Sequence, residues 1–135
     1  MSKEISVKKF IDNDRLKEKA KELLNNEEQL GSLLKAVAKM ASNKNAFKEI
    51  LETIMLFISL IKDYAKGDYR EIPMMKVVLI LASLIYALSP LDFIPDSIPG
   101  IGSTDDIAIL AYVCKKVYNE LEDYKIWKER FIIAA

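Results

Sequence analysis

The amino-acid sequence predicts an all-α protein, and three observations support this class. The 135 residues include only four glycines and four prolines, so turns are few and the elements between them are long. Apolar residues recur at intervals of three and four, as in amphipathic helices, and no segment shows the alternation of a strand. The length fits one domain with one core. We therefore expect residues 1–135 to form a single bundle of about five helices.

The spacing of the apolar residues predicts helices at residues 5–24, 30–41, 46–66, 73–88 and 103–123. The first is rich in lysine and fits a surface helix, either solvated or lying on a membrane, with a cap among residues 12–14. The third is apolar all round at residues 54–58, so we expect it to pass through the centre of the protein. Gly67 suits the end of the third helix, and Pro73 suits the first turn of the fourth.

The fourth predicted helix has no charged residue from Val77 to Leu88. At the helical rise this run is about 18 Å long, whereas the hydrocarbon core of a bilayer is about 30 Å thick. A free-standing transmembrane span is therefore disfavoured. The run fits either a buried core helix or one arm of a hairpin that dips into a membrane.

The composition excludes several classes of activity. The net charge is zero, so the chain lacks the strongly basic character of nucleic-acid-binding proteins. The chain has no histidine and one cysteine, Cys114, which excludes Ser-His-Asp and Cys-His catalysis, internal disulfides and the usual zinc sites. Cys114 lies in an apolar run, where we expect a buried and inert thiol. The N-terminus has no apolar signal-peptide core, which predicts a cytoplasmic protein that is not secreted.

The most unusual stretch is residues 89–106, which holds three of the four prolines, two of the four glycines and four aspartates. Ser89, Pro90 and Asp92 have the form of a helix start, and Pro95 limits that helix to about one turn. A turn follows at Pro99, and a second helix start at residues 103–106 places two carboxylates at the positive end of the helix dipole. Each aspartate therefore has a structural role open to it.

A pattern of prolines, aspartates and a glycine at fixed offsets, with a few other residues between them, runs through this stretch and the residues just before it. Its positions are Tyr86, Ser89, Pro90, Asp92, Ile94, Pro95, Asp96, Ile98, Pro99, Ile101, Gly102, Asp105 and Asp106. This pattern resembles the signature of the YkvA-like family, catalogued as domain of unknown function 1232. The match covers about residues 77–114, a hairpin that would form the family-like core of the domain. The resemblance implies a small helical protein, often membrane-associated, with no established biochemical activity. A similar segment occurs near the membrane-spanning part of a RING-type ubiquitin ligase of the endoplasmic reticulum.

The four aspartates of the stretch, Asp92, Asp96, Asp105 and Asp106, are the candidate site for an ion or a polar ligand. If the hairpin brings these carboxylates together, their repulsion must be relieved by helix dipoles and backbone N–H groups, by protonation, or by Mg²⁺ or Ca²⁺. No nucleophile, base or phosphate-binding loop accompanies them, so we assign no catalytic residue and predict no other cofactor.

Three functions are compatible with the sequence. We favour a non-enzymatic helical module that docks on a membrane surface or on a membrane protein, either peripheral or partly inserted. The second is a metal-dependent enzyme built on the aspartates. The third is a soluble module that binds a partner protein through adaptable methionines: Met40, Met55, Met74 and Met75. No nucleic-acid partner is expected, and a homodimer is left open.

Overall fold

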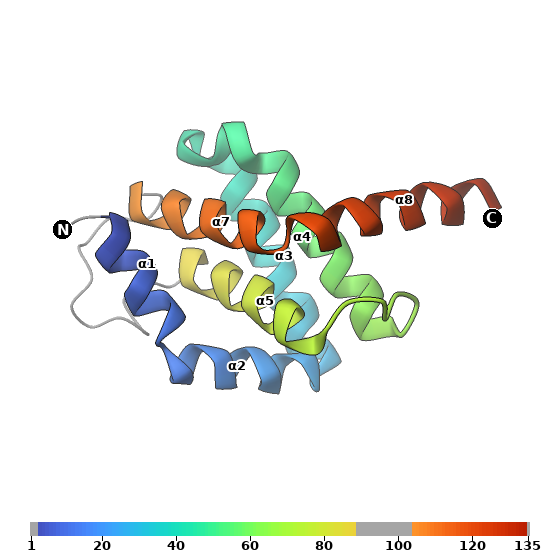
Figure 1. Cartoon of the computed structure of the whole chain (residues 1–135), viewed down its shortest axis with the longest axis horizontal. Coiled ribbons are helices and arrows are strands. Elements are labelled where there is room, and N and C mark those ends of the chain that lie inside the picture. The colour runs from blue at the N-terminus through green and yellow to red at the C-terminus, as the bar shows by residue number, and fades with distance from the viewer. Residues whose placement is uncertain (1–2, 89–103, 135) are drawn as a thin grey trace.

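The computed structural model describes residues 3–88 and 104–134 (Figure 1). These residues form helices and no strand, which confirms the all-α class. They contain seven α-helices and one 3₁₀ helix: α1 (Lys3–Ile11), α2 (Asp14–Leu24), α3 (Glu27–Asn43), η1 (Asn45–Ile50), α4 (Leu51–Lys66), α5 (Met74–Leu88), α7 (Thr104–Lys116) and α8 (Tyr118–Ala134). The number exceeds the five predicted because three of the predicted helices are each divided in two.

The divisions have local causes. The first predicted helix breaks at Asn13, whose side chain accepts a hydrogen bond of 3.0 Å from the backbone N–H of Leu16 and so caps α2. The third begins as the 3₁₀ helix η1. The last is interrupted at Val117 and then continues to residue 134, well beyond the predicted end. Because backbone hydrogen bonds bridge the interruption, from Val117 to Val113 and from Leu121 to Val117, α7 and α8 follow each other closely in space (Figure 1).

Helix α5 forms the centre of the bundle. Between Val77 and Ala87 every residue except Leu79 is buried. The helix packs against α2, α3, α4 and α7, while α1 packs against α7 (Figure 1). The charge-free run is therefore covered by protein on nearly all sides. Burial of this much apolar surface, at about 25 cal/mol per Å², is the main source of stability for the fold.

Helix α4 does not occupy the centre as its sequence suggested. Within its apolar segment Met55 is 42% exposed and Leu56 is only half-buried. The reason is that α5 carries a longer charge-free run and takes the central position, which leaves one side of α4 at the surface. The end of α4 was predicted correctly, because Gly67 adopts a left-handed conformation with φ of 86°.

Candidate functional site

The predicted aspartate site lies mostly outside the described residues. This applies to Asp92 and Asp96, and to the structural positions of the same motif, Ser89, Pro90, Pro95, Pro99 and Gly102. Asp105 and Asp106 are in the first turn of α7, as the predicted helix start requires, but their side chains are not described. Helices α5 and α7, which flank the motif, pack against each other. In the described part of the chain no group of three acidic or cysteine side chains is placed to hold a metal ion. The ion site therefore stays a prediction.

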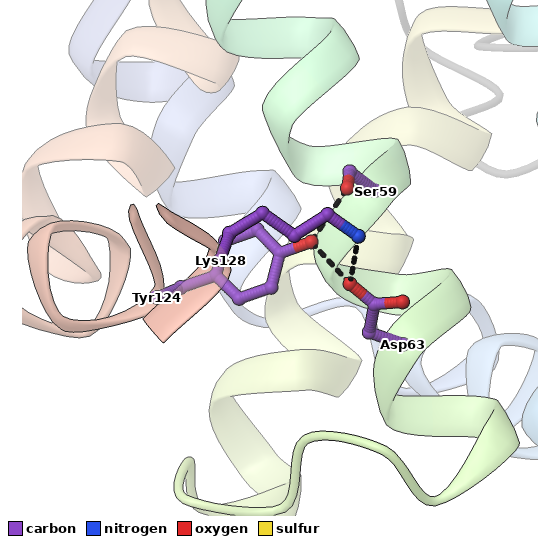
Figure 2. Close-up of polar contacts among 4 residues, drawn as sticks. All are labelled: Ser59, Asp63, Tyr124 and Lys128. Atoms are coloured by element: carbon purple, nitrogen blue, oxygen red, sulfur yellow. Dashed lines mark hydrogen bonds and ion pairs between the residues drawn. The ribbon is translucent and has the colours of Figure 1, made fainter. Parts of the chain in front are cut away.

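A buried polar cluster joins α4 to α8 (Figure 2). The Asp63 carboxylate accepts a hydrogen bond of 2.5 Å from the Tyr124 hydroxyl and an ion-paired hydrogen bond of 2.9 Å from the Lys128 ammonium group. The Tyr124 hydroxyl also lies 2.5 Å from the Ser59 hydroxyl. Tyr124 is fully buried and the Asp63 side chain is 10% exposed, so this carboxylate depends on its two donors in place of water.

The chemistry of this cluster is structural. Burial, followed by the hydrogen bond to Asp63, raises the pKa of Tyr124 well above its usual value, so the phenol stays protonated and acts as a donor. Ser59 bonds to this phenol rather than to a base, and the Lys128 ammonium is committed to Asp63. Aromatic packing of Tyr69 and Trp127 against Tyr124 closes the region further. The cluster ties α8 to the bundle and offers no activated nucleophile.

Sequence reasoning missed this cluster, although one local signal was present. Asp63 follows the buried Leu60 by three residues and Ser59 by four, which places a carboxylate near the buried face of the helix. Its partners, by contrast, lie 61 and 65 residues away along the chain. Helical periodicity contains no information about such a pairing.

An exposed pair of methionines begins α5. Met74 is 50% exposed and Met75 is 54% exposed, although apolar side chains of this size are usually covered. Each of the two methionines lines a different hollow. The first, of about 360 Å³, is called here the lysine hollow and is lined by Ile11, Lys17, Pro73, Met75, Lys76, Val78, Leu79, Tyr112 and Lys116. The second, of about 260 Å³, is called the arginine hollow and is lined by Lys21, Leu24, Asn25, Tyr64, Ala65, Arg70 and Met74.

Every charged residue that lines these two hollows is a cation. Two of the five are paired with carboxylates: Lys21 lies 3.5 Å from Glu18, and Lys76 lies 3.7 Å from Glu120. The other three, Lys17, Arg70 and Lys116, make no ion pair with a described residue, although Arg70 stacks on Tyr64 and Lys116 lies 5.9 Å from the Tyr112 ring centre. The surface around the methionine pair is thus both apolar and basic.

A third hollow, of about 360 Å³, lies between α4 and α7 and contains the cysteine. Its lining is mainly apolar and includes Ile54, Phe57, Leu110 and Cys114. Cys114 is half-buried rather than fully buried as predicted, because its side of α7 faces this hollow. Burial nevertheless raises the pKa of the thiol, which keeps it protonated and agrees with the expected inert role.

None of the helices in the described ranges has the length and hydrophobicity needed to cross a bilayer.

Comparison with curated proteins shows a clear relative, described as an uncharacterized membrane protein YkvA from Bacillus subtilis (strain 168). The two chains are 33% identical over 81 residues, which cover 60% of this chain and 76% of the relative. No solved structure matches the chain. The family described as a protein of unknown function (DUF1232) matches residues 76–112, from α5 to α7. Taken with the extent of the similarity to YkvA, this match shows that the chain belongs to the DUF1232 family.

Proposed function

We propose that this protein is a non-enzymatic helical module that docks on the surface of an anionic membrane. The observation that carries the proposal is the exposed pair Met74 and Met75, each of which lines a hollow whose charged residues are all cations. The combination is that of a membrane-surface contact, in which apolar side chains enter the interface while basic groups meet anionic headgroups. The YkvA relative is described as a membrane protein, which supports the same proposal.

The magnitudes explain why both parts of this surface are needed. A basic residue near an anionic leaflet contributes about 1 kcal/mol, so Lys17, Arg70 and Lys116 together contribute about 3 kcal/mol. Full burial of a methionine side chain contributes about 2 kcal/mol, and each of these two is already half covered, so the pair adds about 2 kcal/mol. The sum is about 5 kcal/mol, which corresponds to reversible docking rather than permanent insertion. Neither part alone would hold the protein on a membrane.

Co-sedimentation with lipid vesicles tests the proposal. We expect the protein to pellet with vesicles of phosphatidylcholine mixed with an equal amount of phosphatidylglycerol, and to remain in the supernatant with phosphatidylcholine alone. Binding should weaken as the salt concentration rises toward about 0.5 M, where surface charges are screened. The double variant Met74→Ser, Met75→Ser should lose about 2 kcal/mol, or about thirtyfold, in affinity while keeping its fold, because both side chains are exposed.

Met55→Ser is the matched control, since Met55 is also exposed but lies on α4 and lines neither hollow. It should bind vesicles as the wild type does. Failure of the wild type to pellet with anionic vesicles at low salt would refute docking on lipid. Binding to cell membranes that is lost after protease treatment of those membranes would instead indicate a membrane protein as the partner.

A further inference from the structure

The lysine hollow differs from an ordinary solvated helix face because its cations come from three helices. Lys17 belongs to α2, Lys76 to α5 and Lys116 to the end of α7. Lysines on one helix spread along its surface, whereas lysines from three helices converge only where the fold brings them together. Lys17 and Lys76 are also half-buried, so their aliphatic stems cover apolar surface while their charges remain at the hollow.

The floor of the hollow is apolar and reaches the core. It includes Val78, which is fully buried, and Leu79, the one residue between Val77 and Ala87 that the protein does not bury. Between Val77 and Ala87 the cover of the central helix is therefore incomplete at one position, and that position lies in the lysine hollow. Its volume of about 360 Å³ is in the range of small-molecule sites.

The geometry of Lys76 suits it to hold an anion. Its ammonium group donates a hydrogen bond of 3.0 Å to the backbone carbonyl of Lys116 and lies 3.7 Å from the Glu120 carboxylate. These contacts fix the charge at the rim between α5 and α7. Glu120 neutralises one of the three lysine charges, which leaves two for a ligand of opposite sign.

We propose that the lysine hollow binds one anionic phospholipid, an inference that rests on the proposed membrane-surface function. The phosphate group lies between Lys17, Lys76 and Lys116, and the upper part of an acyl chain lies on Leu79 and Tyr112. A phosphate with an attached hydrocarbon chain is the ligand whose charge and apolar portion match both parts of the hollow. The wider surface provides contact with the membrane, and this site selects an anionic lipid within it.

Calorimetric titration with dihexanoylphosphatidylglycerol, kept below its micelle concentration, separates this site from general adsorption. The wild type should bind it saturably at one site, and should bind dihexanoylphosphatidylcholine at least tenfold more weakly because three lysines face the headgroup. Inorganic phosphate should bind more weakly still, since it has no chain to cover Leu79. Adsorption without a site would show no saturation, and its preference for the anionic headgroup would not depend on the lysines of this hollow.

Two matched charge variants complete the test. Lys17→Gln with Lys116→Gln should weaken binding of the short-chain lipid at least tenfold, and Lys35→Gln with Lys39→Gln should not change it. The second pair removes the same charge from exposed positions on α3 that line neither hollow. Neither lysine of the first pair has an ion pair with a described residue, so both variants should melt as the wild type does.

The outcomes distinguish the inference from the proposed function. Equal loss in the two charge variants, or no saturable binding of the short-chain lipid, would overturn the phospholipid site. If vesicle binding persisted in that case, the membrane-surface function would stand without it. Saturable, lysine-dependent binding of the short-chain lipid by a protein that never pellets with vesicles would support the site and overturn the membrane-surface function.

Discussion

Two charged contacts between helix α8 and other described helices differ mainly in the burial of their carboxylates. The inner contact joins Lys128 to Asp63 at 2.9 Å, with the Asp63 side chain only 10% exposed and Tyr124 bonded to the same oxygen. The outer contact joins Glu120 to Lys76 at 3.7 Å, with the two side chains 24% and 35% exposed. The two lysines are equally exposed, at 35%, so the difference lies in the carboxylates: water reaches Glu120 but hardly reaches Asp63.

This difference separates a structural contact from an exchangeable one. Removing one partner from a buried ion pair costs about 3–5 kcal/mol because the other charge is left without compensation. A solvated pair contributes about 0–1 kcal/mol because water replaces the lost partner. The fold therefore depends on the inner contact, while the outer contact at the lysine hollow is weak enough for an anionic ligand to replace. The contact that stabilises the fold and the contact at the proposed binding surface therefore lie at different positions along α8.

The largest effect is expected from Asp63→Ala. This change removes the acceptor of both the Tyr124 hydroxyl and the Lys128 ammonium group. Since Lys128 is partly exposed and is able to turn toward water, we expect a loss near the lower end for buried pairs, about 3 kcal/mol in the free energy of unfolding. Urea denaturation followed by circular dichroism measures it.

Asp68→Ala is the control for this variant, because Asp68 is an exposed aspartate just after the end of α4. Its substitution should change the free energy of unfolding by less than about 0.5 kcal/mol. A loss below about 1 kcal/mol for Asp63→Ala would mean that the inner contact is no stronger than the outer one.

A smaller effect is expected from Tyr124→Phe, which keeps the packed ring and removes the hydroxyl. Asp63 and Ser59 each lose one hydrogen-bond partner, so the free energy of unfolding at neutral pH should fall by about 1–2 kcal/mol. Tyr118→Phe, at a position that is 57% exposed, should leave it unchanged. If the two variants proved equally stable, the buried hydroxyl would contribute nothing.

The same variant carries a pH signature. The pKa of Tyr124 is raised in the folded state, so above a pH of about 10 the unfolded chain releases the phenol proton while the folded chain keeps it. Stability therefore falls as the pH rises beyond that value, by up to about 1.4 kcal/mol per pH unit. Tyr124→Phe lacks this proton, so the stability difference from the wild type should shrink above pH 10. A constant difference would contradict the raised pKa.

The contrast between the two contacts also shows how far sequence reasoning reaches. Apolar spacing predicted the helices, and local chemistry predicted the cap near Asn13 and the end of α4 at Gly67, because these features depend on residues a few positions apart. The inner contact and the lysine hollow depend on which helices become neighbours. The central position of α5 instead of α4 also depends on which helices become neighbours, because the two apolar helices compete for that position.

The predicted aspartate site remains a prediction for a related reason. The sequence indicates helix starts around residues 89–92 and 103–106, and α7 does begin at Thr104 as the second of these requires. Convergence of Asp92 and Asp96 on Asp105 and Asp106 would depend on the path of the intervening stretch, which proline and glycine positions restrict but do not specify.

The smallest effect on stability is expected from Glu120→Gln, which should instead increase binding to anionic vesicles. This change breaks the solvated pair with Lys76, so the free energy of unfolding should change by less than about 0.5 kcal/mol. It also frees one positive charge at the lysine hollow, worth about 1 kcal/mol at an anionic surface, so affinity for phosphatidylglycerol-containing vesicles should rise about fivefold. Glu122→Gln removes the same charge from a pair with Lys125 on α8, at 3.6 Å and away from both hollows, and should leave affinity unchanged. An equal rise in both variants would mean that total charge, rather than the exchangeable contact at Lys76, controls binding.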